Sequence, residues 1–189
     1  MRAWSVRHMA YAAIASLLLG AVMTLGDLVW AELRLRHQMS YGLIHGAAIC
    51  LCIGAVIGVR ERRLLPALIG GPLIGLIAAG GFYLLAPWLR YSAMFPMWML
   101  FWVLFALLQD RLTPPFGPHQ AVARGLVAAL LSGAAFYAIS GIWTRPSPGG
   151  PDYLRHFLSW SFAFCPGFAA LFVGRGTVRL KDPLTGQSP

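Results

Sequence analysis

The sequence has few charged side chains, and acidic ones are the scarcest of all. Only 11% of its 189 residues are charged, with six acids against fifteen lysines and arginines, while 58% are hydrophobic. Soluble domains carry about a quarter charged residues, so this chain lacks the polar groups needed to cover a surface facing water. We therefore expect lipid as its solvent, in agreement with a mean hydropathy of +0.67.

Cysteine is rare as well, and the signatures of common enzymes are missing. The three cysteines, Cys50, Cys52 and Cys165, lie in apolar runs, and an odd number without framework spacing argues against a disulfide scaffold. On a helix, Cys50 and Cys52 would point to nearly opposite sides, which argues against a metal pair. The chain has no His-Glu-x-x-His, Gly-x-Ser-x-Gly or glycine-rich phosphate loop. We therefore expect no catalytic set, no bound metal and no cofactor.

Basic residues are the exception to this scarcity, and their positions decide what they indicate. The net charge is +9 and the pI is near 10.3, values that also occur in nucleic-acid-binding proteins. Here the arginines stand in short groups at the ends of apolar runs, not in one patch or stripe. They indicate anchors at a membrane surface, and we expect no nucleic-acid partner.

Six apolar runs reach the length of about 20 residues that a helix needs to cross a bilayer. They cover approximately residues 8–30, 39–59, 64–88, 92–109, 123–143 and 154–174. The sequence therefore predicts an all-α protein, a single domain over 1–189 formed by six transmembrane helices.

The distribution of lysine and arginine between the loops predicts the orientation of this bundle. Five arginines fall on one side: Arg34, Arg36, Arg90, Arg145 and Arg155. Ten basic residues fall on the other: Arg2, Arg7, Arg60, Arg62, Arg63, Arg111, Arg124, Arg175, Arg179 and Lys181. Because short loops rich in lysine and arginine stay in the cytoplasm, we expect both termini there.

Small residues recur every four positions in two of the predicted helices. The stripes are Gly42, Gly46, Cys50, Gly54 and Gly58 in the second run, and Gly71, Gly75 and Ala79 in the third. Such stripes let two helix backbones approach closely, so we expect these helices to pack together. Pro72 after two glycines predicts a kink, which either only adjusts the packing or leaves a pocket inside the bundle.

Asp27 is the one acidic residue inside a predicted span. A carboxylate at membrane depth is costly and seeks partners in the bundle interior, and His45 stands at a similar depth on the next span. The alternative is that Asp27 is hydrated at the headgroup level, because Trp30 marks the water boundary nearby. The start of the sixth run adds polar residues on the same side, which either hold a lipid headgroup or simply extend to the interface: Asp152, Arg155 and His156.

Four short segments between residues 109 and 176 carry a resemblance to a known family. Asp110-Arg111 is followed after four residues by Phe116-Gly117, and Ser140-Gly141-Ile142-Trp143 ends the fifth run. Pro151-Asp152-Tyr153-Leu154 and Ser159-Trp160 lead into the sixth run, which closes with Gly167, six residues, and Gly174-Arg175. Their order and separations resemble the second half of insulin-induced gene (Insig) proteins.

The resemblance implies a function as well as a fold. Insig proteins have six spans and cytoplasmic termini; they are non-enzymatic regulators that bind oxysterols between helices and hold sterol-sensing membrane partners. Asp110, with Arg111, would then bind a partner, although Asp110 could equally cap its helix or pair with Arg111. The sequence departs from the family where a span-four glutamine falls near Ala93, beside Ser92, and a span-five asparagine is replaced by Ser140.

We therefore expect a bacterial homologue in the inner membrane, or in the endoplasmic reticulum membrane of a eukaryote. Its cavity would hold diacylglycerol or a sterol-like molecule, contacted by Asp27, Trp30, His45, Ser92, Phe136, Ser140, Trp143 and Trp160. The small-residue stripes also allow a homo-oligomer. Two alternatives stay open: a small membrane enzyme acting on lipids at the outer interface through Asp27, His45 and His156, and an assembly or chaperone subunit.

Overall fold

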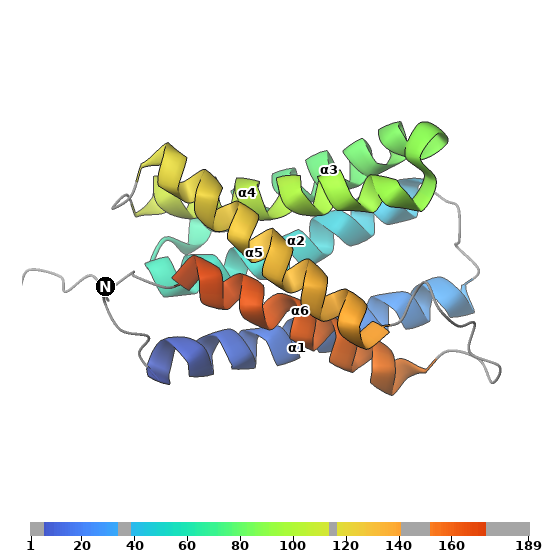
Figure 1. Cartoon of the computed structure of the whole chain (residues 1–189), viewed down its shortest axis with the longest axis horizontal. Coiled ribbons are helices and arrows are strands. Elements are labelled where there is room, and N and C mark those ends of the chain that lie inside the picture. Colours follow the sequence, from blue (N-terminus) through green and yellow to red (C-terminus); the bar gives the residue numbers. More distant parts are fainter. Residues whose placement is uncertain (1–5, 34–38, 114–116, 141–151, 173–189) are drawn as a thin grey trace, which may run out of the picture.

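The computed structural model describes residues 6–33, 39–113, 117–140 and 152–172, and nearly all of them are helical. Six α-helices and one short 3-10 helix follow one another in these segments (Figure 1): α1 Val6–Glu32, α2 Met39–Glu61, α3 Leu64–Leu89, η1 Arg90–Ala93, α4 Met94–Leu112, α5 Pro118–Ser140 and α6 Tyr153–Phe172. No strand occurs in the described segments, which confirms the all-α class.

Four helical stretches within the described residues are long and apolar enough to cross a bilayer: Val6–Val29, Met39–Glu61, Leu64–Leu112 and Pro118–Ile139. They indicate a membrane-embedded protein. The third stretch is 49 residues long and contains α3, η1 and α4. Helix α6 is not among the four, because it carries Arg155 and His156 near its start and the buried Ser159 and Ser161 further on. Polar residues of this kind are tolerated where a helix faces the interior of a bundle.

The packing of the helices explains this difference. Helix α6 is held between α1 and α5, while α2 packs mainly on α3, and α4 lies against α5 and α3 (Figure 1). Helices α1 and α2 share only a small contact. The chain reverses direction between α3 and α4 at Arg90, whose φ of 50° lies in the left-handed region.

The predicted close packing of the small-residue stripes is confirmed. A Cβ atom added to Gly71 would overlap the carbonyl oxygen of Cys50, and one added to Gly75 would overlap that of Gly46. The two backbones are therefore in direct contact, which only glycine permits at these positions. Helix α3 continues through Pro72 as one helix.

Large aromatic side chains fill the space between α4 and α6. Trp102, Phe105, Phe164, Phe168 and Phe172 are each at most 1% exposed. The rings of Trp102 and Phe168 meet edge to face with centroids 5.8 Å apart, a favourable geometry for aromatic pairs. This aromatic column sets the distance between α4 and α6 and continues toward Trp98 and Trp160 at one end.

The glycine contact can be tested with a pair of alanine substitutions in the same helix. Gly71→Ala should lower the stability of the protein by about 1–3 kcal/mol, because the new methyl group must push α2 away. The control is Gly80→Ala, whose new methyl group would have its nearest neighbour at 3.9 Å. Both variants gain the same helix propensity, so unfolding in mixed detergent micelles isolates the packing effect. Equal stability of the two variants would contradict the proposed contact.

Candidate functional site

An apolar cavity of about 180 Å³ lies between α4, α5 and α6. Its wall is formed by Met94, Phe95, Trp98 and Met99 of α4, by Ala129, Leu130, Gly133, Ala134, Phe136 and Tyr137 of α5, and by Trp160 of α6. Almost all of the atoms that face the cavity are apolar. The cavity can therefore take an apolar group and offers little to a charged one.

The cavity exists because α5 places small residues opposite aromatic residues of α4. Ala129, Gly133 and Ala134 lie on the cavity wall, and a Cβ atom added to Gly133 would come no closer than 3.8 Å to Trp98. The aromatic rings of the two helices hold the remaining walls apart. Phe95 stacks on Tyr137 with ring centroids 5.4 Å apart.

The cavity opens toward the outer flank of α4 and α5. Three of its wall residues are well exposed: Leu130 at 66%, Phe95 at 47% and Met99 at 40%. In a membrane-embedded protein, an apolar flank of this kind faces lipid chains. A chain or ring can therefore enter from the membrane without crossing the bundle.

A hydrogen bond fixes one aromatic wall of the cavity. Trp98 Nε1 donates to Ser132 Oγ at 2.8 Å, and the fully buried Ser132 hydroxyl donates in turn to the carbonyl oxygen of Ala129 at 3.2 Å. This bond joins α4 to α5 and holds the Trp98 indole in place beside the cavity.

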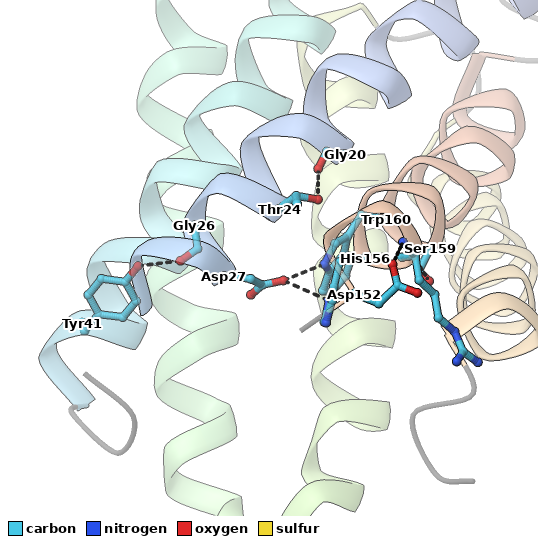
Figure 2. Close-up of polar contacts among 10 residues, drawn as sticks. Gly20, Thr24, Gly26, Asp27, Tyr41, Asp152, His156, Ser159 and Trp160 are labelled. Atoms are coloured by element: carbon cyan, nitrogen blue, oxygen red, sulfur yellow. Dashed lines mark hydrogen bonds and ion pairs between the residues drawn. The ribbon is translucent and has the colours of Figure 1, made fainter. Parts of the chain in front are cut away.

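Asp27 holds a second aromatic side chain of the wall, Trp160, which lies beside Trp98 with ring centroids 6.4 Å apart. Trp160 Nε1 donates to Asp27 Oδ2 at 3.0 Å, and His156 Nδ1 lies 3.6 Å from the same oxygen. Figure 2 shows Asp27 of α1 pointing toward His156 and Trp160 of α6. The side chains of Asp27 and His156 are 30% and 45% exposed, so this pair lies at the edge of the bundle. Asp27 thus has partners within the protein, as one of the two interpretations predicted.

His45, the predicted neighbour of Asp27, lies on α2. Tyr41 donates its hydroxyl to the carbonyl oxygen of Gly26 at 3.0 Å (Figure 2), and His45 stacks on Tyr41 with ring centroids 5.7 Å apart. His45 is close enough to Asp27 for an electrostatic interaction. The predicted proximity of Asp27 and His45 is confirmed, and a direct hydrogen bond between them stays a prediction.

The other predicted lipid contacts lie in different places. Phe136 and Trp160 line the cavity, whereas Ser92 is exposed in η1 and is not part of the cavity wall. The side chains of Trp30 and Ser140, and the whole of Trp143, lie outside the part of the chain that the structure describes. The wall residues that were not predicted from the sequence include Phe95, Trp98, Met99 and Gly133.

The predicted partner-binding residues lie at the opposite end of the bundle. Asp110 is only 8% exposed near the end of α4, and the adjacent Arg111 is exposed. Gln109 Nε2 donates to Glu61 Oε1 at 2.6 Å and joins α4 to α2. Arg124 of α5 donates to the carbonyl oxygen of Leu171, near the end of α6.

Comparison with known proteins adds no family to this description. No known protein family, curated protein or solved structure matches the chain. Within the described residues, no three His, Cys, Asp or Glu side chains are grouped to hold a metal ion. Fold and site together define a membrane-embedded helical protein with an apolar cavity open to its flank and one carboxylate behind the cavity wall.

The Trp98–Ser132 hydrogen bond can be tested by removing the hydroxyl. Ser132→Ala should destabilise the protein by about 1 kcal/mol, because the indole N–H then has no acceptor in an apolar environment. Ser159→Ala is the matched control: Ser159 is also buried, but its hydroxyl donates to Arg155 in its own helix, at 2.7 Å. Unfolding in mixed micelles measures the stability of both variants. An equal loss of stability would contradict a stabilising role of the Trp98–Ser132 hydrogen bond.

Proposed function

We propose that this protein is a non-enzymatic lipid-binding membrane protein, in the manner that its resemblance to the Insig family implies. The observation that supports this proposal is the apolar cavity between α4, α5 and α6, which opens to the flank through exposed Leu130 and Phe95. Largely apolar, partly enclosed cavities are the common form of small-molecule sites. Phe136 and Trp160 are the predicted lipid contacts that lie on its wall.

The size of the cavity limits which part of a lipid it can take. An apolar cavity of about 150 Å³ accommodates benzene, so one of about 180 Å³ takes a ring or a short length of alkyl chain. We therefore propose that one chain of diacylglycerol, or one end of a sterol-like molecule, enters the cavity. The rest of the ligand lies along the exposed flank of α4 and α5.

Binding from the membrane requires a source of affinity other than the hydrophobic effect, since the ligand leaves an environment that is already apolar. Close contact with fixed walls supplies it, because dispersion attraction depends on the number of atoms at contact distance. The aromatic rings of Phe95, Trp98, Phe136 and Trp160 provide this contact.

We further propose that the six α-helices make six crossings, with both termini in the cytoplasm. Two features support this orientation: the reversal of the chain at Arg90 divides the longest apolar stretch into α3 and α4, and ten of the fifteen basic residues fall on the side of the termini.

A reporter that fluoresces only in the cytoplasm tests the orientation. Fused to the C-terminus of the full chain expressed in bacteria, it should fluoresce; inserted between residues 147 and 148, it should not. The same reporter fused to the N-terminus, ahead of Arg2 and Arg7, should also fluoresce. Fluorescence at the inserted position, or its absence at either terminus, would contradict six crossings with cytoplasmic ends.

Two kinds of protein partner were expected, a second copy of the chain and another membrane protein. The two small-residue stripes that allowed a homo-oligomer face each other inside one protomer, so they do not form an oligomer surface. A membrane-protein partner at Asp110 and Arg111 would meet Arg111 first, because Asp110 is buried. We propose the inner membrane of a bacterium as the location, from the alanine, arginine and glycine bias of the sequence.

A lipid-transforming enzyme is the second candidate, and one observation favours it. Asp27 and His156 approach to 3.6 Å, and a histidine beside a carboxylate can act as a general base. In that case a bound lipid would be converted during incubation, and His156→Ala would abolish the conversion while the lipid was still retained.

Filling the cavity tests the binding proposal. Gently purified wild-type protein should retain a lipid in native mass spectrometry, and Gly133→Leu should reduce the retained fraction about tenfold, because the new side chain occupies the cavity. Ala48→Leu is the control, since Ala48 is exposed on α2. A wild type without lipid, or a Gly133→Leu variant that retains as much as the control, would contradict lipid binding in this cavity.

A further inference from the structure

Trp160 belongs to two environments at once. Its ring forms part of the cavity wall and lies against Phe136 with centroids 4.5 Å apart and against Phe164 at 6.1 Å. Its single polar atom, Nε1, points the other way and donates to Asp27 of α1. Figure 2 shows Asp27 on the α1 side of this indole. One side chain therefore connects the cavity with a carboxylate that is not part of the cavity wall.

The orientation of the indole depends on this hydrogen bond. The rings of Phe136 and Phe164 that contact Trp160 carry no hydrogen-bond acceptor, so without Asp27 the indole N–H would lose its partner. An unmade hydrogen bond in an apolar environment is costly, and the indole would turn to find another acceptor. Because the ring is part of the wall, such a rotation changes the shape of the cavity.

The groups around Asp27 keep its carboxylate in place. His156 stands one helical turn before Trp160 on α6, so both side chains project from the same face of the helix toward Asp27. His45 and Tyr41 approach from α2 and interact with Asp27 electrostatically. Arg155 is turned away and donates to the carbonyl oxygen of Ile139 at 3.1 Å.

We propose that Asp27 is a positioning residue for the cavity: its carboxylate fixes the Trp160 indole and thereby sets the affinity for an alkyl chain that Asp27 does not touch. This inference rests on the proposed lipid binding and adds how the binding site is controlled. Asp27 acts on the wall through its hydrogen bond to the Trp160 indole. His156 contacts the Asp27 carboxylate and takes no part in that hydrogen bond.

Binding of 1,2-dioleoylglycerol to detergent-purified full-length protein tests the proposal. Asp27→Ala should weaken binding about tenfold, the equivalent of one lost hydrogen bond to a charged acceptor. Asp27→Asn keeps an acceptor oxygen and should restore affinity to within about threefold of wild type. Thr24→Ala is the matched control on α1, because the Thr24 hydroxyl donates to the carbonyl oxygen of Gly20 in its own helix, and it should change affinity less than about threefold.

A double-substitution cycle separates positioning from a general loss of stability. Trp160→Phe keeps a smaller aromatic ring at the wall but removes the N–H, so Asp27→Ala should have no further effect in this background. Two groups that act as one unit are non-additive in this way. Additive effects of the two substitutions, or an Asp27→Asn variant as weak as Asp27→Ala, would overturn the proposal.

A ligand without a polar head distinguishes action through Trp160 from direct contact with the lipid. Dodecane cannot form hydrogen bonds, so its ability to displace labelled dioleoylglycerol reports on the cavity wall alone. We expect Asp27→Ala to weaken dodecane and dioleoylglycerol by the same factor. Weakening of dioleoylglycerol alone would show that Asp27 contacts the headgroup, and would overturn the positioning role.

Fluorine NMR of protein labelled with 5-fluorotryptophan tests the positioning without any ligand. The resonance that Trp160→Phe removes identifies Trp160; it should shift or broaden in Asp27→Ala and stay near its wild-type position in Asp27→Asn. This shift together with no lipid binding by the wild type would overturn the proposed function but support positioning of the indole by Asp27. An unchanged resonance in Asp27→Ala would overturn the inference itself.

Discussion

Lipid chains are as apolar as leucine side chains, so the helices of a membrane-embedded bundle gain little from covering apolar surface with one another. Cohesion then depends on close backbone approach and on hydrogen bonds between helices, and this protein uses both. Helices α2 and α3 meet where glycines bring the two backbones into direct contact, as at Gly71 against Cys50. Helices α1 and α2 share a small contact, but Tyr11 donates to Val56 at 2.8 Å near one end and Tyr41 donates to Gly26 near the other.

Hydrogen bonds between helices also hold the two indoles of the cavity wall. Trp98 joins α4 to α5 through Ser132, and Trp160 joins α6 to α1 through Asp27. The two indoles lie at one end of the aromatic column, with ring centroids 6.4 Å apart. The column keeps α4 and α6 apart, and the ring of Trp102 leaves no room for a Cβ atom at Gly167. The cavity is thus the end of the column, where α5 contributes alanine and glycine and no ring fills the space.

The sequence was sufficient for the features that each helix carries by itself. Apolar length predicted the helical ranges, and the four-residue spacing of glycines predicted the contact between α2 and α3 because both backbones must be free of side chains at the same spacing. Position along the bundle was also predictable, which is why Asp27, His45 and His156 were expected on one side. Which helices are neighbours was not: Asp27 is 133 residues from Trp160, and periodicity contains no information on such a pair. Most of the cavity wall was missed for the same reason, since Trp98 and Gly133 come from different helices, although Phe136 and Trp160 were among the predicted contacts. Asp110 was expected to be available to a partner, but a charge at a helix end does not show that its side chain turns inward.

The two fixed indoles explain how an apolar cavity could compete with the membrane around it. A lipid chain in the bilayer already has apolar neighbours, so a loose cavity offers it no advantage. A cavity whose walls are held in advance loses less side-chain freedom when the chain enters, and more of the contact energy then appears as affinity. Ser132 holds the wall on α4 and Asp27 holds the wall on α6, each through one indole N–H. We therefore propose that a polar residue in a membrane-embedded helix need not touch a ligand to serve its binding, because Asp27 acts through its hydrogen bond to Trp160.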